Sequence, residues 1–442
     1  MRLPKLLVSL LFVVCAIPSL AQSLAPTVDK GDSVWMIVAT ALVLLMTPAL
    51  ALFYAGMVQR KNVLNTMMLS FVMMGVVSLS WVLIGYTLSF GKSNGFIGGL
   101  EYAFANGVSL RIPYGSQTIP AALFLLFQMK FAIITPALMS GAVAERIKFG
   151  GYLVFTLLWS ILIYAPIACW VWNPDGWLCK MGALDFAGGT VVHLASGVSA
   201  LALCLVLGRR KTTEIAPNNL TITLLGAGLL WFGWFGFNAG SSLAMNDVAI
   251  NAFLTTHLAA AAGMLAWMLV EYVRHQKATT LGGASGLVAG LVVITPAAGF
   301  VSVGSAILIG LSAGVLCCLA IELKHKFGYD DALDVVAVHG IGGLVGSILT
   351  GVLASSAINP VVEASLSGGR THLIFVQLLT AGVVIVVAGS GSWLLARGVN
   401  ATVGLRADVE HEEVGLDRAY HGEGGYELGE SLLPQERELV GA

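Results

Sequence analysis

Two histidines lie in stretches of small and apolar residues, where an ionisable ring is unexpected. His193 lies in "DFAGGTVVHLASG", residues 185–197, and His339 follows 146 positions later in "DVVAVHGIGG", residues 334–343. A neutral imidazole donates a hydrogen bond from one ring nitrogen and accepts one at the other, and it can exchange a proton near neutral pH. The two rings could therefore hold a small polar molecule or relay a proton, provided that the fold brings them together.

The composition shows what kind of fold must position these histidines. Of the 442 residues, 57% are hydrophobic and 11% are charged, and the mean hydropathy is +0.86. A soluble domain carries about 25% charged residues, so the sequence predicts an integral membrane protein surrounded by the lipid bilayer. The net charge of −1 leaves no basic excess for binding nucleic acid. The cysteines form no CxxC or Cys/His cluster, so neither a metal site nor another cofactor is expected.

The N-terminal residues have the pattern of a cleaved export signal. Arg2 and Lys5 precede an apolar run over residues 6–17, and small residues follow up to Ala21. This order predicts a signal peptide over residues 1–21 and a mature N-terminus on the outer side of the membrane.

Apolar runs of about 20 residues, long enough to cross the bilayer, predict an all-α polytopic membrane domain over residues 22–400 with eleven transmembrane helices. The runs cover residues 33–56, 63–90, 118–143, 150–171, 186–207, 220–240, 250–273, 281–298, 304–323, 335–357 and 371–398. Lysines and arginines concentrate on alternate connections, which are cytosolic by the positive-inside rule. The N-terminus is therefore expected outside and the C-terminus in the cytosol.

Each half of this domain has five helices, an odd number, so the second half must run in the opposite direction to the first. This predicts an inverted five-plus-five repeat, a common plan for transporters whose site lies near the bilayer midplane. His193 lies eight residues beyond Asp185, at the outer start of its helix, and His339 lies nine residues beyond Asp330, at the inner start of its own. The rings are then about 12 and about 13 Å from opposite faces of a core about 30 Å thick. We expect the two imidazoles to meet near its middle.

Seven motifs resemble those of the Amt/Mep/Rh ammonium transporter family, and specifically its bacterial Amt branch. They are "FQMKF", "GAVAERIKF", "ALDFAGGTVVHLASG", "GWFGFNAGS", "GLVVITPAAGFV", "DVVAVHGIGGLVGSILTG" and "EEVGLDRAYHGE", and they extend over essentially the whole mature chain. The resemblance implies an eleven-helix protomer of the bacterial inner membrane. It also implies a homotrimer with one narrow pore through each protomer, and ammonium as the ligand.

The resemblance further implies roles for individual residues. The outer ammonium-recruitment residues would be Phe131, Trp172, Ser241 and Asp185, the gate residues Phe131 and Phe237, the pore-lining pair His193 and His339, and a polar residue at the pore mouth Gln128. The implied function is transport, in which ammonium loses its proton near the gate and crosses as ammonia while the histidines carry the proton. Other interpretations stay open, because tryptophans often lie at the membrane interface, an aspartate can cap a helix, and a histidine can bond a neighbouring helix.

Two other functions are compatible with these residues. One is an ammonium sensor that hardly transports, although such proteins usually carry an appended signalling domain. The other is a membrane haem protein with the two histidines as axial ligands, which the lack of further redox ligands in the sequence disfavours.

Lys130 and His257 depart from the family pattern. A charged side chain in the middle of a span is costly, so Lys130 must reach the interface, meet a carboxylate, face a wet trimer interface or alter the pore entrance. His257 could be a packed polar contact or a third member of the relay.

Residues 401–442 are polar and rich in turn-forming residues. Composition alone predicts a flexible tail. The family resemblance instead implies an ordered cytosolic regulatory tail that packs under the neighbouring pore and can be bound by a PII-type nitrogen regulatory protein.

Overall fold

A computed structural model describes residues 27–211 and 216–426. The signal peptide predicted over residues 1–21 lies outside these ranges. The described part of the chain is helical, and ten of its helices are long and apolar enough to cross a membrane, while α12 is a shorter apolar helix between two of them. The prediction of an all-α fold with eleven spans is confirmed.

The eleven spans follow one another along the chain, several of them built from consecutive pieces. They are α2 (Lys30–Ala55); η1 (Arg60–Asn62) with α3 (Val63–Ser80), η2 (Trp81–Gly85) and α4 (Tyr86–Phe90); α5 (Ala121–Val143); α6 (Phe149–Trp159) with η4 (Ser160–Tyr164), α7 (Ala165–Trp172) and α8 (Trp177–Lys180); η5 (Gly189–Leu194) with α9 (Ala195–Leu207); α10 (Leu220–Ala239) with η6 (Gly240–Ser242); α11 (Asp247–His275); α12 (Thr280–Ile294); α13 (Val303–Phe327); η7 (Val336–Ile341) with α14 (Gly342–Leu353); and α16 (Gly369–Thr402). Short helices lie in the connections and after the last span: η3 (Ala103–Ala105), α15 (Val361–Ser365), α17 (Val409–Val414) and α18 (Leu416–His421).

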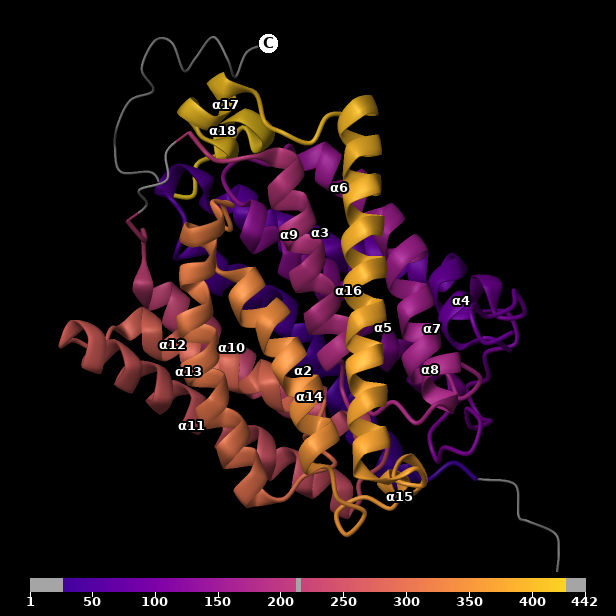
Figure 1. Ribbon diagram of the computed structural model, residues 1–442. Coiled ribbons are helices and arrows are strands. Elements are labelled where there is room, and N and C mark those ends of the chain that lie inside the picture. Colours follow the sequence, from indigo (N-terminus) through magenta and orange to yellow (C-terminus); the bar gives the residue numbers. More distant parts are fainter. Residues whose placement is uncertain (1–26, 212–215, 427–442) are drawn as a thin grey trace, which may run out of the picture.

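The two halves pack in the same pattern. α3 lies against α5 as α11 lies against α12, and α5 lies against α9 as α12 lies against α14. The first helices of the halves, α2 and α10, pack against each other, and α16 lies outside the repeat against α9 and α14 (Figure 1). We call the end with α15 the outer end and the end with α17 and α18 the inner end, after the predicted orientation.

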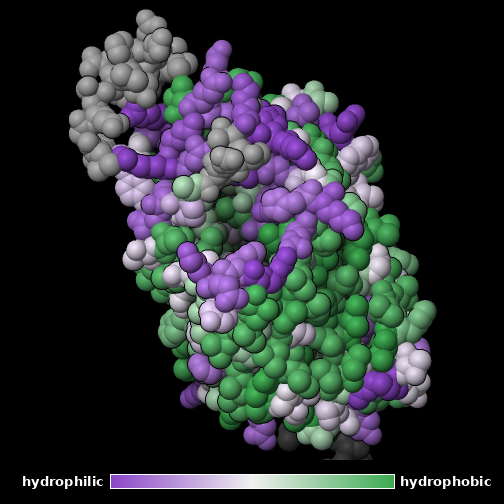
Figure 2. All heavy atoms as spheres, turned by 60° about the vertical axis from the view of Figure 1, so that its left-hand side comes forward, coloured by the Kyte–Doolittle hydropathy of each residue, from purple (hydrophilic) through white to green (hydrophobic). Residues whose placement is uncertain are grey.

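On the face shown in Figure 2, hydrophobic side chains form a broad band, and hydrophilic side chains gather at the inner end. Inside this band the helices approach closely where glycines remove side-chain bulk. A Cβ atom on Gly197 of α9 would lie 2.2 Å from the backbone nitrogen of Gly340, and one on Gly226 of α10 would lie 2.4 Å from that of Phe53. Both distances are far below van der Waals contact, so these crossings depend on glycine.

The described residues after α16 fold back under the bundle. Lys61 Nζ donates to the carbonyls of Glu412 at 2.9 Å and Glu413 at 2.6 Å. The carboxylate of Asp417 accepts the backbone N–H groups of Leu64 at 3.0 Å and Asn65 at 2.8 Å, in the first turn of α3. This part of the tail is thus attached to its own protomer at the inner end.

Candidate functional site

The structure brings the two histidines together. His193 Nδ1 lies 3.1 Å from His339 Nδ1, so one nitrogen donates a hydrogen bond to the other. The rings are nearly parallel, with an angle of 21° and centroids 5.2 Å apart, and both are buried. His193 Nε2 has no hydrogen-bond partner among the described residues. The pair can therefore still offer a nitrogen to a small polar molecule.

Equivalent backbone features position each histidine. His193 lies in the π-helical turn η5 and His339 in the π-helical turn η7, each at the start of the last helix of its half. The two helices cross where Gly197 meets the backbone of His339 and Gly340. Because the halves are inverted, the helices enter from opposite ends and deliver the rings to one place.

A carboxylate eight residues before each histidine binds the start of the helix. Asp185 accepts the backbone N–H groups of Gly188, Gly189, Thr190 and Val191 at 2.7–3.2 Å, and also the Thr190 hydroxyl. Burial raises the pKa of the Asp185 carboxyl, although the hydrogen bonds from Thr190 and the backbone oppose this by favouring the ionised form. Its oxygens are directed at its own helix, so Asp185 does not line the outer cavity described below.

The inner counterpart is Asp331. Its Oδ2 accepts the N–H of Val336 at 2.7 Å, five residues along the chain, as Asp185 accepts that of Thr190. The carboxylate that binds this helix start is therefore that of Asp331 and not that of its neighbour Asp330, which the sequence analysis places there. Asp330 instead pairs with the guanidinium of Arg210, with Nη2 and Oδ1 2.7 Å apart.

Two stacked phenylalanines cover the histidines on the outer side. The rings of Phe131 and Phe237 are 4.3 Å apart and inclined by 32°, and both are buried. The Phe237 ring is 6.0 Å from that of His193. Trp234 stacks on His193 as well, with ring centroids 5.4 Å apart and the rings nearly parallel. The His193 ring is therefore packed against two aromatic rings besides that of His339.

A cavity of about 150 Å³ lies on the outer side of this stack. Four residues singled out from the sequence line it: Gln128, Phe131, Trp172 and Ser241. The rings of Phe131 and Trp172 are nearly perpendicular and 5.7 Å apart. Gln128 Oε1 is buried without a hydrogen-bond partner among the described residues, and Ser241 Oγ donates to the carbonyl of Phe237 at 2.8 Å, which leaves its lone pairs free. Aromatic faces and free oxygen acceptors are the surroundings that an ammonium ion needs once it leaves water.

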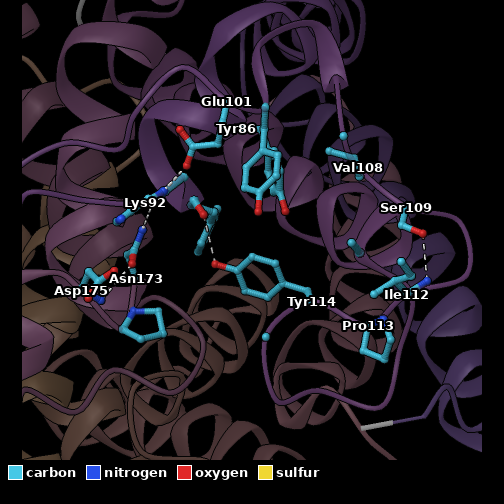
Figure 3. Close-up of a pocket in the computed structure, with 17 residues that line it drawn as sticks. Tyr86, Lys92, Glu101, Val108, Ser109, Ile112, Pro113, Tyr114, Asn173 and Asp175 are labelled. Atoms are coloured by element: carbon cyan, nitrogen blue, oxygen red, sulfur yellow. Dashed lines mark hydrogen bonds between the residues drawn. The ribbon is translucent and has the colours of Figure 1, made fainter. Parts of the chain in front are cut away.

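A second cavity of about 390 Å³ lies beside the first, and Phe90, Tyr114 and Pro174 line both. Figure 3 shows the Tyr114 ring among the lining side chains, with Glu101 and Asp175 on one side of it. The Tyr114 ring stacks on Phe124 at 4.1 Å, and its hydroxyl donates to the carbonyl of Phe90 at 3.2 Å. Tyr114 therefore lies between the two cavities, together with Phe90 and Pro174.

Sequence reasoning missed several of these residues. Phe124 shares one helical face with Gln128 and Phe131, at spacings of four and seven residues. The "FLLFQMKF" pattern therefore could have predicted that Phe124 faces the same cavity. Tyr114 lies in the long connection before α5, where no periodicity indicates which side chain reaches the cavity.

Lys130 and His257 do not line either cavity. Lys130 is half-buried on α5, and His257 is exposed on the outer surface of α11. An altered pore entrance or a third relay histidine therefore finds no support in the geometry. Among the described residues there is also no group of three or more His, Cys, Asp or Glu side chains arranged to hold a metal ion.

Inverted helical halves around a buried histidine pair define the class of an all-α polytopic membrane protein. The profile of the Ammonium Transporter Family matches residues 34–426. An ammonium transporter of Bacillus subtilis is 49% identical over 401 residues, which cover 90% of this chain and 99% of that protein. One of Mycobacterium tuberculosis is 49% identical over 434 residues, covering 90% and 91%. The chain belongs to the ammonium transporter family.

Solved structures agree with this assignment. Saccharomyces cerevisiae Mep2 superposes with a TM-score of 0.82 at 37% identity, covering 93% of this chain and 95% of that one. A structure described as a sensor Amt protein has a TM-score of 0.82 at 29% identity, covering 89% and 98%.

Proposed function

We propose that this protein transports ammonium inward by recruiting the ion at the outer aromatic cavity, removing its proton and conducting ammonia past the histidine pair. The observation that carries the proposal is the order of the parts: a cavity with aromatic faces and free oxygens, then two stacked rings, then two hydrogen-bonded imidazoles. The ammonium transporters of Bacillus subtilis and Mycobacterium tuberculosis, each 49% identical to the chain, support the same ligand.

Selection against other cations follows from the ring stack. Ammonium and potassium are similar in size, so carbonyl oxygens would discriminate poorly between them. Only ammonium can give up a proton and continue as a neutral molecule through an apolar passage, where a bare charge is costly. The buried Phe131 and Phe237 rings provide such a passage, so the barrier itself is selective.

The histidines supply the polar contacts in that passage. A neutral ring can accept a hydrogen bond from ammonia at its free nitrogen, and the Nδ1–Nδ1 bond gives a proton a route from one ring to the other. In this mechanism the separated proton follows the pair while ammonia passes beside it, which moves net charge inward.

The proposal includes the setting of the pore. The protomer is placed in the bacterial inner membrane with its N-terminus outside and its C-terminus in the cytosol, and it assembles as a homotrimer with one pore in each copy. Its domains are a signal peptide, a membrane domain and a cytosolic tail, and the docking of α17 and α18 at the inner end supports a regulatory role for that tail. A PII-type protein that binds this end is part of the same proposal.

Ammonium-evoked current in vesicles reconstituted with the purified protein tests the relay. His193→Ala is expected to lower the current at least about tenfold, because it removes one of the two proton carriers. His275→Ala, which changes an exposed histidine at the inner end of α11, serves as the matched control and should conduct normally. Equal currents in the wild type and His193→Ala would refute the relay.

An ammonium sensor with little transport is the alternative, and the likeness to a sensor Amt protein favours it as the second candidate. Uptake of labelled methylammonium by cells separates the two. Uptake by the wild type above that of cells without the protein supports transport, whereas binding of ammonium without uptake would establish the sensor.

A further inference from the structure

Gln377 is a buried polar side chain that lines neither outer cavity. It lies eight residues beyond the first residue of α16, the span outside the inverted repeat. A buried amide costs free energy unless its donors and its acceptor find partners. The carbonyl oxygen and the amide nitrogen of Gln377 both bond to groups outside α16, so this side chain joins α16 to its neighbours.

One partner is the backbone of Leu184, the residue directly before Asp185. Gln377 Oε1 accepts the N–H of Leu184 at 2.8 Å, and Gln377 Nε2 donates to the carbonyl of Leu184 at 2.8 Å. Two bonds to one residue fix the orientation of its backbone as well as its position. The Leu184 side chain also belongs to a small buried apolar cluster with Leu373, one turn before Gln377 in α16. α16 therefore holds the segment that leads into the outer helix start.

The other partner is α14, the helix that continues from His339. Gln377 Nε2 also donates to the carbonyl of Ser347 at 3.1 Å, eight residues beyond His339. A Cβ atom on Gly351 would lie 3.0 Å from Gln377 Cγ, so α14 and α16 approach each other closely here. The two hydrogens of one amide nitrogen are thus directed at one carbonyl from each histidine helix segment.

The segment held by Gln377 also reaches the recruitment cavity. The carbonyl of Asp185 accepts the indole N–H of Trp172 at 2.9 Å, while the carboxylate of Asp185 accepts the N–H groups at the start of η5. Asp185 therefore caps the helix start locally, and Gln377 determines where that start lies. A shift of Leu184 would displace the Trp172 ring and the His193 ring together.

We propose that Gln377 is a positioning residue of the pore, which sets the place of Trp172 and the approach of His193 to His339 through the backbone of Leu184. Gln377 acts without touching the ion, because its amide bonds only to the protein groups named above among the described residues. This inference rests on the proposed function, since it takes from it the roles of the three rings. Loss of the amide should therefore change the affinity for ammonium and the maximal rate of transport together.

Hydrogen exchange tests the contact without relying on transport. In Gln377→Leu, exchange of the backbone amides of residues 184–193 should rise about fivefold, because Leu184 loses both of its partners on α16. Thr380→Val is the matched control, because Thr380 is buried on the same helix and its hydroxyl bonds to the carbonyl of Val376 within α16. Equal exchange in Gln377→Leu and Thr380→Val would overturn the proposal.

The kinetics of labelled methylammonium uptake separate a positioning role from a merely stabilising one. In Gln377→Leu the KM should rise about fivefold and the maximal rate per folded protein should fall, because Trp172 and His193 are both displaced. A residue that only stabilises the fold would lower the amount of active protein and leave the KM unchanged. An unchanged KM in Gln377→Leu would therefore overturn the proposal.

Gln377→Glu provides a variant of nearly the same shape whose hydrogen bonding depends on pH. A protonated carboxyl can accept the N–H of Leu184 and donate to its carbonyl, as the amide does, whereas a carboxylate has no hydrogen to donate. The KM of Gln377→Glu relative to that of the wild type should therefore fall towards one as the pH is lowered. The same ratio for Gln377→Leu should not change with pH. Ratios that vary in parallel for the two variants would contradict a role for these hydrogen bonds.

The same measurements distinguish failure of this inference from failure of the proposed function. A wild type that takes up no methylammonium, together with faster exchange over residues 184–193 in Gln377→Leu, would refute transport and support the contact. A wild type that transports, with no exchange difference between Gln377→Leu and Thr380→Val, would refute the role of Gln377 and leave transport intact.

Discussion

The outer and inner starts of the two histidine helices are held in different ways. At the outer start, Asp185 accepts five hydrogen bonds from residues 188–191 of its own chain segment. At the inner start, Asp331 accepts the backbone N–H of Val336 at 2.7 Å, and its Oδ1 has no partner among the described residues. The outer start is therefore fixed by a single local carboxylate.

The inner start is instead positioned by ion pairs between distant segments. Arg210 lies between two carboxylates, with Nη2 2.7 Å from Asp330 Oδ1 and Nη1 2.9 Å from Glu145 Oε2. Burial would raise the pKa of Asp330, but Arg210 and Arg146 outweigh it and lower that pKa to about 2. A start held by long-range contacts next to the tail can be changed from the inner end, whereas a locally capped start cannot.

The largest decrease in stability is expected for Asp185→Ala, which removes the carboxylate that holds the outer start of the histidine helix. It leaves four backbone N–H groups and a hydroxyl without their acceptor, at about 1 kcal/mol each, or on the order of 5 kcal/mol. We expect a strong decrease in the melting temperature of the detergent-solubilised protein. Asp175→Ala is the control, since the only side-chain partner of the Asp175 carboxylate among the described residues is the exposed Lys180. Similar melting temperatures for both variants would show that Asp185 does not hold the helix.

The next largest decrease in stability is expected for Arg210→Ala, because it removes the ion pairs that position the inner helix start. Removing one partner of a buried ion pair costs about 3–5 kcal/mol. Here Glu145 loses its ion-pair partner, and Asp330 retains only the more distant Arg146, at 3.9 Å. The adjacent and exposed Arg209 provides the control Arg209→Ala. Hydrogen exchange measured across residues 330–340 should accelerate in Arg210→Ala alone. Unchanged exchange there would contradict a long-range anchor for the inner start.

The effect of Asp331→Asn is expected to depend on pH. Burial, followed by the charge of Asp334, raises the pKa of Asp331 to about 6, so the folded protein retains a proton that the unfolded chain has released. Stability contributed by this group is therefore lost as pH rises from about 4 to about 6, by on the order of 3 kcal/mol. The melting temperature of Asp331→Asn should therefore rise relative to that of the wild type as the pH increases across this range. Thermal scans at several pH values would measure this difference. A difference that does not vary with pH would refute the assignment.

The smallest expected effect is that of Asp417→Ala in the tail. Loss of two hydrogen bonds to the first turn of α3 costs about 1 kcal/mol, as for a helix cap. The tail should open more often, so hydrogen exchange in α17 and α18 should rise about fivefold without a change in melting temperature. Glu410→Ala, which alters an exposed residue of α17, is the control. Equal exchange in both variants would show that Asp417 does not attach the tail.

The spans and the histidine contact could be predicted because both follow from simple counts. The length of the apolar runs identified the eleven helices. Helix rise placed His193 and His339 at nearly equal distances from opposite faces of the membrane. Phe131, Trp172, Ser241 and Gln128, assigned by resemblance, meet at one cavity. Their roles in transport remain predictions.

The features that could not be predicted depend on backbone paths rather than on residue types. Asp330 and Asp331 are adjacent and chemically alike, and only the turn before η7, where Asp334 has a φ of 61°, decides which of them faces the helix start. Tyr114 reaches the cavity from a long connection whose course no periodicity reveals. The carboxylate of Asp185 accepts backbone N–H groups and does not line the cavity. The residue type alone does not decide between these two roles.

The π-helical turns bear on the history of the molecule. A π turn carries one residue more than an α turn. η5 and η7 carry it at nearly matching positions, because η5 begins four residues before His193 and η7 begins three residues before His339. The turns η2 and η4 of the first half have no such match, because α11 and α13 are unbroken α-helices. The simplest history places the shared extra residue in an ancestral five-helix unit before it was duplicated, and the unshared turns after it. The π turns that carry His193 and His339 would then be older than the turns η2 and η4, which only the first half has.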